Sequence, residues 1–194
     1  MHAFRVTKGA RRLSVALVTA SAAALCACGS GGSGGSSPAP AVPAPATLRL
    51  SSPAFAAGSA IPRRYTCDGA NMSPPLSFGR VPASARELAL SVDDPDAPGG
   101  DFTHWLLYRV PAGTRSLAAG AVPPGAVQGR NSFGKDGYSG PCPPKGAGPH
   151  GYRFTLYALR RPLALAPGAS PHVFASAVAG TAFAGGRLRG SYSR

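Results

Sequence analysis

The sequence contains few acidic residues and lacks the spacings that mark common catalytic and metal centres. Its 194 residues include 7 Asp and Glu against 20 Lys and Arg, a formal net charge of +13. There is no HExxH or CxxC spacing, and neither Ser91 nor Ser139 lies in a G-x-S-x-G elbow, so a metalloenzyme or serine hydrolase gains little support. No basic cluster with interleaved aromatic residues is present, which argues against nucleic acid as a partner. The positive charge favours anionic partners, although the arginines are scattered singly.

The sequence also lacks an apolar run long enough for a comfortable transmembrane helix. The run from Leu13 to Leu25 follows a basic stretch without acidic residues, a pattern typical of a secretory signal peptide. It ends in Leu25-Cys26-Ala27-Cys28, which resembles a bacterial lipobox, in which cleavage before Cys28 leaves a thiol that takes up diacylglycerol. We therefore predict a lipoprotein signal peptide over residues 1–27 and lipidation of Cys28. An ordinary signal peptide without lipid attachment is the alternative.

Residues 29–46 offer almost no large apolar side chains and cannot build a core. They are rich in Gly and Ser and then in Pro and Ala, so we predict a tether over residues 28–46. Residues 47–194 suffice for one domain and contain no internal repeat. Together these features predict an exported protein that is lipid-anchored to the bacterial cell envelope, on the periplasmic side and at the outer membrane if the host is Gram-negative.

Two cysteines, Cys67 and Cys142, belong to the predicted domain. A pair of cysteines in an exported domain favours a disulfide. Two buried free thiols are the alternative.

Two apolar runs flank an acidic loop in the middle of the chain. The runs are Leu88 to Val92 and Trp105 to Val110, and the loop between them contains two prolines and two adjacent glycines, which predicts two strands joined by a structured connection. Aspartates at positions 93, 94 and 96 lie where the first strand ends, and His104 lies where the second begins. If the strands pair antiparallel, carboxylates and imidazole meet at one rim of a sheet. That rim is the candidate site.

The rest of the predicted domain is mostly strand. We predict strands over Thr47 to Leu50, His150 to Leu159 and Arg187 to Tyr192. The second of these alternates, which places His150, Tyr152, Phe154 and Leu156 on one face. Ser170 can cap a helix that ends near Gly180, with Pro171 at its first position. The pattern predicts a β-rich domain with one or two short helices.

Two histidines, His104 and His150, lie at strand starts behind loops rich in Gly and Pro. Neighbouring carboxylates should hold their imidazoles partly protonated, so that they can donate hydrogen bonds to an anion such as phosphate. Backbone N–H groups of glycine-rich loops would meet the anion directly. The glycines that suggest such loops are Gly137, Gly140, Gly146 and Gly148.

The same histidines allow two other interpretations. With an aspartate, His104 and His150 could form a metal site of two histidines and one carboxylate. Each could also be a hydrogen-bonded rim residue without a ligand. The remaining histidine of the domain, His172, is assigned to no site.

Three motifs follow one another along the predicted domain. They are Asp94-Pro95-Asp96-Ala97-Pro98, then Thr103-His104-Trp105-Leu106-Leu107, then Gly140-Pro141-Cys142-Pro143-Pro144-Lys145-Gly146 with His150-Gly151-Tyr152. In this order they resemble the phosphatidylethanolamine-binding protein family, and especially its bacterial branch, the Raf kinase inhibitor-like proteins. Tyr65 to Gly69, reading YTCDG, matches the bacterial branch. The similarity covers about residues 47–194.

This resemblance implies an antiparallel β-sandwich-like fold with a shallow anion-binding pocket at one end. Members bind phosphate-like and phospholipid head groups, some inhibit kinases or proteases, and none needs a cofactor. One departure concerns Cys142, which stands where eukaryotic members have glycine. Carried over by position, the ligand-binding residues are Asp94, Asp96, Pro98, His104, Cys142, Pro143, His150 and Tyr152.

The sequence therefore predicts a non-enzymatic, lipid-anchored envelope protein that binds a small anion or phosphorylated head group. Because imidazolium binds an anion better than imidazole does, affinity should fall as pH rises through roughly 6 to 7. Cytosolic kinase regulation is not carried over, although the domain could modulate a partner protein in the envelope. The alternatives are metal-assisted hydrolysis at the same rim and inhibition of a secreted protease.

Overall fold

The computed structural model describes residues 46–194, which belong to the compact unit Val42–Arg194. The predicted signal peptide, the lipidation site Cys28 and all but the last residue of the predicted tether lie outside the described residues. Within residues 46–194, no helix combines the length and apolar character needed to cross a membrane.

The described chain forms nine strands, one α-helix and one short 3₁₀ helix. In chain order these are β1 Ala46–Thr47, β2 Leu50–Ser51, η1 Arg63–Tyr65, β3 Leu76–Phe78, β4 Glu87–Asp94, β5 Phe102–Pro111, β6 Ser116–Leu117, β7 Val127–Gln128, β8 His150–Leu159, α1 Pro171–Ala179 and β9 Ala182–Tyr192.

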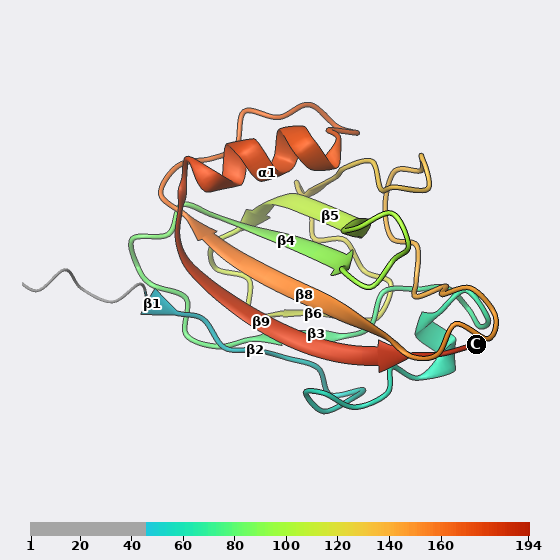
Figure 1. Cartoon of the computed structure of the whole chain (residues 1–194). Helices are drawn as coiled ribbons and strands as arrows, with labels where there is room; N and C mark the ends of the chain where they lie inside the picture. Colours follow the sequence, from blue (N-terminus) through green and yellow to red (C-terminus); the bar gives the residue numbers. More distant parts are fainter. Residues whose placement is uncertain (1–45) are drawn as a thin grey trace, which may run out of the picture. The chain divides into compact units, whose positions relative to one another are not determined.

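The strands form two sheets. The larger has the order β1-β9-β8-β4-β5-β7 and is antiparallel except at its β1 edge, and the smaller has the order β2-β3-β6. The small sheet lies behind the large one in Figure 1, and α1 runs across the other side of the large sheet. The mainly β, antiparallel fold predicted from the sequence is confirmed.

The central strands β4, β5 and β8 carry the candidate residues. β4 pairs antiparallel with both neighbours, placing Val92 opposite Phe154 and Asp93 opposite Arg153. Since side chains alternate along a strand, Asp93 and Asp94 point to opposite faces of the sheet. Asp94 shares the inner face with Val92, which is fully buried in the core between the sheets.

A register shift in the β4–β5 pair decides where His104 points. Val92 lies opposite Trp105 whereas Asp93 lies opposite Thr103, so His104 is an extra residue on β5. Beyond such a bulge, the side chains that would have pointed to one face of the sheet point to the other. It turns Thr103 toward the Asp93 face and His104 toward the Asp94 face.

Two hydrophobic cores lie on the two faces of the large sheet. The larger fills the space between the sheets and includes Leu90, Trp105 and Phe154. The smaller lies beneath α1, where Phe174 and Val178 are the buried side chains of the helix. The helix begins as predicted, because the Ser170 hydroxyl accepts a hydrogen bond from Val173 N and Pro171 occupies the first turn.

Two strand predictions differ from the structure in extent. The strand predicted over Thr47 to Leu50 is divided into β1 and β2, which belong to different sheets. The last strand begins at Ala182, five residues before the prediction, and includes Gly185 and Gly186. A Cβ atom on Gly186 would lie 2.1 Å from Leu48 O, so glycine is required here for the two backbones to approach.

Candidate functional site

A pocket of about 180 Å³ opens where β4 ends and β5 and β8 begin. It is lined by Asp94, Ala97, Pro98, Phe102, His104, Phe133, Cys142, Pro143, Pro144 and His150. Six of the eight residues carried over from the resemblance therefore lie together, although they come from separate segments of the chain. The other two, Asp96 and Tyr152, do not line the pocket.

Asp94 and His150 form a buried hydrogen-bonded pair in the pocket. Asp94 Oδ2 lies 2.8 Å from His150 Nδ1, and the side chains are only 5% and 7% exposed. Asp94 Oδ1 also accepts a hydrogen bond from Asp96 N at 2.9 Å, which fixes the turn after β4. Asp96 in turn accepts from Gly151 N at 2.8 Å. Asp96 thus supports the backbone beside His150 and does not contact the pocket itself.

His104 is held by two backbone carbonyls. Its Nδ1 lies 2.7 Å from Ser139 O and 3.1 Å from Gly140 O, and because both partners are acceptors, Nδ1 carries a hydrogen. Burial lowers the pKa of His104, and this effect outweighs the opposing influence of the two carbonyls and Asp94. The expectation that nearby carboxylates keep this imidazole partly protonated is therefore wrong for His104. Its neutral ring presents Nε2 as a hydrogen-bond acceptor.

Tyr152 lies behind the pocket. Its ring packs edge-on against His104, with centroids 5.2 Å apart. Its buried hydroxyl has no hydrogen-bond partner among residues 46–194. Burial and the negative charge of Asp94 raise the Tyr152 pKa, so the phenol stays protonated at neutral pH. Tyr152 therefore supports the His104 ring from beneath, which corrects its predicted place in the lining.

A disulfide joins Cys67 and Cys142, whose Cα atoms are 5.4 Å apart. Beside it, Cys67 N donates to Pro141 O at 3.1 Å. The bond ties the loop that contributes Cys142 and Pro143 to the segment after η1. The pocket wall on this side is thus fixed covalently.

Of the four glycines that suggested anion-binding loops, three do not have a free N–H group, and Gly148 N is the one that makes no hydrogen bond within residues 46–194. Gly137 N donates to Gly129 O, Gly140 N donates to the Asn71 side chain, and Gly146 N donates to Arg194 O. These three donors are used to hold loops to the rest of the domain, so they do not meet a ligand. The side chains of His104 and His150, which line the pocket, are therefore more direct contacts for a ligand than these three backbone groups.

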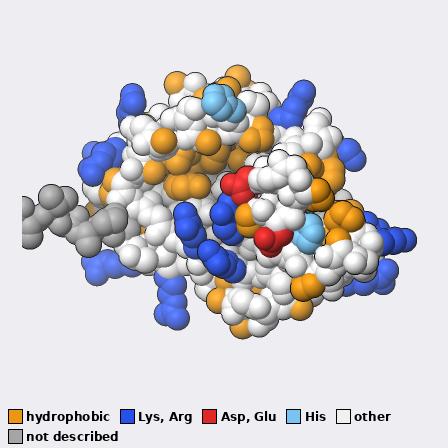
Figure 2. Space-filling model, viewed as in Figure 1, with side chains coloured by type: hydrophobic (Ala, Val, Ile, Leu, Met, Phe, Trp, Pro, Cys, Tyr) orange, Lys and Arg blue, Asp and Glu red, His pale blue; other side chains and the backbone are white. Residues whose placement is uncertain are grey.

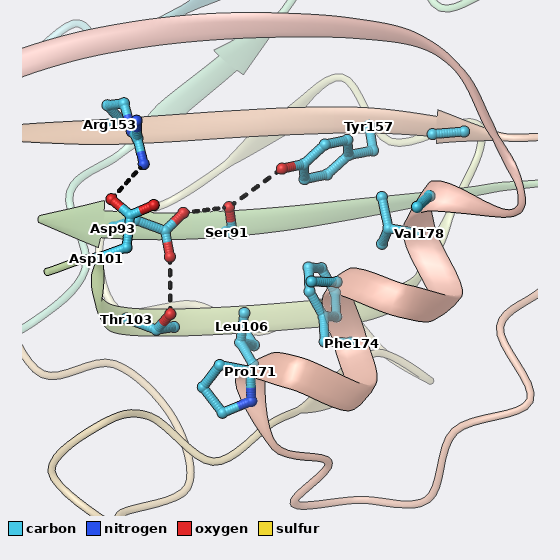
Figure 3. A pocket seen from close by; sticks show the side chains of 13 residues that line it. Ser91, Asp93, Asp101, Thr103, Leu106, Arg153, Tyr157, Pro171, Phe174 and Val178 are labelled. Atoms are coloured by element: carbon cyan, nitrogen blue, oxygen red, sulfur yellow. Dashed lines mark hydrogen bonds and ion pairs between the residues drawn. The ribbon is translucent and has the colours of Figure 1, made fainter. Parts of the chain in front are cut away.

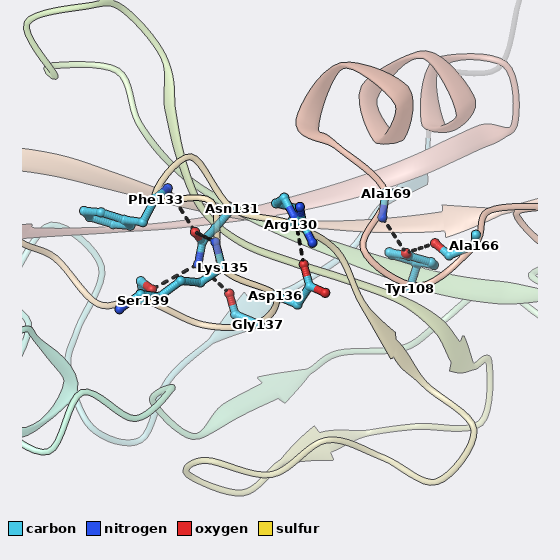
Figure 4. Close-up of polar contacts among 10 residues, drawn as sticks. All are labelled: Tyr108, Arg130, Asn131, Phe133, Lys135, Asp136, Gly137, Ser139, Ala166 and Ala169. Carbon is cyan, nitrogen blue, oxygen red and sulfur yellow. Dashed lines mark hydrogen bonds and ion pairs between the residues drawn. The ribbon is translucent and has the colours of Figure 1, made fainter.

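Sequence reasoning missed the aromatic wall of the pocket, Phe102 and Phe133. Phe102 precedes His104 by two residues on β5, a spacing that indicates the same face, and their ring centroids are 5.3 Å apart. Phe133 is placed by Asn131, whose Oδ1 accepts from Phe133 N and Lys135 N, and whose Nδ2 donates to Gly137 O and Ser139 Oγ (Figure 4). Phe133 reaches the site through tertiary packing, with its ring centroid 4.7 Å from that of Phe102 and 5.4 Å from that of His104.

The geometry gives no support to the metal and hydrolase alternatives. Within residues 46–194, no three His, Cys, Asp or Glu side chains are grouped so that they could hold a metal ion. Ser91 donates to Asp93, and Ser139 accepts from Asn131. Within residues 46–194, the hydroxyl group of neither serine is hydrogen-bonded to a histidine. His172 lies exposed on α1, outside the pocket.

The family model for phosphatidylethanolamine-binding proteins matches residues 51–193. The chain belongs to this family. Membership in this family accounts for the two-sheet fold and for the position of the three sequence motifs around one pocket.

Solved structures of two other family members have the same fold. The phosphatidylethanolamine-binding protein homologue CT736 of Chlamydia trachomatis is 39% identical, with a TM-score of 0.72 over 76% of this chain and 98% of that one. YbcL of Escherichia coli is 31% identical, with a TM-score of 0.73 over 77% of this chain and 99% of that one.

Relatives known from sequence occur in bacteria and archaea. A Methanothermobacter thermautotrophicus protein of the UPF0098 group is 46% identical over 152 residues, covering 76% of this chain and 99% of its own length. A Mycobacterium tuberculosis protein named "Putative lipoprotein LppC" is 48% identical over 145 residues, covering 75% of this chain and 72% of its own length.

Proposed function

We propose that the domain is a non-enzymatic receptor for a small anion or phosphorylated head group, which binds in the Asp94, His104 and His150 pocket. The observation that carries this proposal is the arrangement of the two imidazoles. In each ring Nδ1 is bonded within the domain, and Nε2 makes no hydrogen bond to any residue in 46–194. Both rings line the pocket, so Nε2 is the atom that each offers to a ligand.

The two rings suit a phosphate monoester that still carries one proton. When His150 is protonated, its Nε2 donates a charge-assisted hydrogen bond to a phosphate oxygen while its Nδ1 faces the Asp94 carboxylate. Neutral His104 accepts at Nε2 from the P–OH group. Phe102 and Phe133 provide an apolar side wall that can cover the carbon part of a head group. No cofactor is needed for this binding.

The envelope location is proposed on separate grounds. The lipobox ending in Cys28 and the following tether predict a lipid anchor, and the relative LppC bears the name of a lipoprotein. An anchored domain would meet head groups of the membrane to which it is tethered. No specific observation favours a protein partner or protease inhibition, so these stay predictions.

Calorimetric titration with O-phosphoethanolamine tests the binding proposal. We expect His150→Asn to weaken binding about tenfold or more, because it removes a charge-assisted hydrogen bond while keeping a donor toward Asp94. His172→Asn, on the exposed surface of α1, is the matched control and should bind as the wild type does. Equal affinities of both variants and the wild type would refute the pocket assignment.

The pH profile tests the roles of the two rings. Sulfate carries no proton near neutral pH, so its affinity reports histidine protonation alone and should fall as pH rises. Burial lowers the pKa of His104, so this ring becomes protonated, and strengthens sulfate binding, only at a pH below the ordinary pKa of histidine. Phosphate should bind more tightly than sulfate near pH 6, because only phosphate can donate to neutral His104. Sulfate binding that is independent of pH would contradict the mechanism.

A further inference from the structure

A second and larger cavity lies on the other face of the large sheet. Its volume is about 500 Å³, which lies within the range of small-molecule sites. Figure 3 shows it between the outer faces of β4, β5 and β8 and the helix α1. In Figure 2 hydrophobic side chains gather beneath α1, and acidic and arginine side chains lie next to them. The cavity thus has an apolar part and a polar end.

The apolar part is formed by the helix and the sheet beneath it. Phe174, Ala175 and Val178 line it from α1, and Leu106 lines it from β5. The residues that α1 contributes carry no ionisable group. This part of the cavity therefore suits a hydrocarbon or aromatic body.

The polar end is rich in hydrogen-bond acceptors. Asp93 Oδ2 accepts from the Ser91 hydroxyl at 2.7 Å, and Oδ1 accepts from the Thr103 hydroxyl at 2.8 Å (Figure 3). Because both hydroxyl hydrogens point to Asp93, the Ser91 and Thr103 oxygens are left as acceptors toward the cavity. Tyr157 OH is 3.5 Å from Ser91 Oγ, the outer limit of a hydrogen bond. A ligand atom that contacts Asp93, Ser91 and Thr103 is therefore best a hydrogen-bond donor.

The Asp93 carboxylate is the group at the polar end that can pair with a cation. Arg153 is paired with Asp101 at 2.8 Å, which balances its charge. The Asp93 carboxylate has no cationic partner within hydrogen-bonding distance and is bonded to hydroxyls. The ionisable groups that line the polar end are Asp93, Asp101, Arg153 and Tyr157. On the neighbouring strand β9, Arg189 lies opposite Arg153 and Arg187 lies opposite Thr155.

We propose that this cavity binds a small amphiphilic amine, with its ammonium group at Asp93, Ser91 and Thr103 and its apolar body against Phe174 and Val178. The site is separate from the anion pocket, because Asp93 and Asp94 lie on opposite faces of β4. No other site is assigned to these residues by the family motifs. The proposal stands independently of the anion-binding function.

Titration of the ¹⁵N-labelled domain by NMR with octylamine, octanol and octanoate tests this assignment. The three probes share one chain and differ only in the head group. We expect octylamine to bind with shifts at the amides of Ser91, Val178 and Ala182, and octanol and octanoate to bind at least about tenfold more weakly. Equal binding of the three probes would overturn the ammonium assignment. Shifts confined to the His104 and His150 segments would overturn the location, and no binding by octylamine would overturn the proposal.

Two variants separate the head-group contact from the apolar contact. Asp93→Asn retains the size of the side chain and should weaken octylamine binding about tenfold, whereas Asp136→Asn, a half-exposed carboxylate outside both pockets, should leave it unchanged. Ala175→Phe fills the cavity from α1 without removing a polar group and should abolish octylamine binding. Unchanged binding in both Asp93→Asn and Ala175→Phe would refute the site.

The pH dependence gives a further readout. Burial raises the pKa of Asp93 above its ordinary 3.8, despite the lowering effect of the Ser91 and Thr103 hydrogen bonds. Octylamine affinity should therefore fall as pH falls through this raised value, because protonation removes the negative charge. In Asp93→Asn that loss of affinity should disappear. A wild-type affinity that stays constant down to pH 4 would contradict the ion pairing.

Discussion

Asp93 and Asp94 are adjacent in the sequence, yet they serve two different pockets. Asp94 faces the inner side of β4, where it pairs with His150 at 2.8 Å. Asp93 faces the outer side, where its oxygens accept from two hydroxyls and burial raises its pKa. An aspartate thus orients an imidazole on one face of the sheet and accepts hydrogen bonds from two hydroxyls on the other. The neighbouring side chains of each carboxylate therefore determine what kind of ligand it can bind.

The two pockets also differ in how their walls are held. The Asp94 pocket has a wall fixed by the Cys67–Cys142 disulfide. The Asp93 cavity is covered by α1, whose buried residues are Phe174 and Val178. We therefore expect loss of the disulfide to weaken ligand binding in the Asp94 pocket, and loss of a packed α1 side chain to weaken binding in the Asp93 cavity.

Removal of the disulfide should have the largest effect. In the double variant Cys67→Ala/Cys142→Ala, loss of a crosslink between residues 75 apart should lower the free energy of unfolding by about 4 kcal/mol. Phosphoethanolamine binding should weaken while octylamine binding persists, as measured by urea unfolding and titration. Reduction of the wild type should reproduce both effects. An equal loss at both pockets would show that the walls are not independent.

Truncation of Phe174 should be the next largest change. Phe174→Ala removes a buried ring and should cost about 3 kcal/mol of unfolding free energy. It should weaken octylamine binding and leave phosphoethanolamine binding unchanged. Val173→Ala, on the exposed side of the same helix, is the control and should change stability by less than about 0.5 kcal/mol. Weakened anion binding in Phe174→Ala would indicate coupling between the two faces.

Loss of the Tyr152 hydroxyl should have the smallest effect. This hydroxyl has no partner within residues 46–194, so Tyr152→Phe should change the unfolding free energy by less than about 0.5 kcal/mol. Tyr108→Phe is the matched control, because the Tyr108 hydroxyl donates to Ala166 O and accepts from Ala169 N (Figure 4). Its loss should cost about 1 kcal/mol by urea unfolding. A comparable cost for Tyr152→Phe would indicate that its hydroxyl is satisfied in solution.

Much of the fold could be predicted from the sequence because its central strands have strong local signals. The apolar runs on both sides of the acidic loop become β4 and β5, and the strictly alternating segment from His150 to Leu159 is β8 to the residue. Ser170 and Pro171 mark the start of α1 for reasons that are local to the chain. Pairing of these strands then brought Asp94, His104 and His150 to one rim.

What could not be predicted depends on tertiary contacts. Trp105 points to the inner face, so regular alternation along β5 would have placed His104 on the outer face. The bulge that turns His104 inward cannot be recognised from the sequence. The lowered pKa of His104 follows from burial, which the sequence does not state. The N–H groups of Gly137 and Gly146 are taken by Gly129 and Arg194, and both bonds arise only from loop packing.

The pairing of β1 with β9 has a mechanical consequence. β1 runs parallel to β9 at the edge of the large sheet, with Ala46 opposite Ala184 and Thr47 opposite Gly185, and Leu48 N adds a hydrogen bond to Gly185 O. A force that pulls the N-terminal side of the chain along the direction of β1 would load these hydrogen bonds together in shear. They would then not break one at a time. The β1–β9 pair, where the N-terminal side of the chain joins the sheet, is therefore suited to resist such a force.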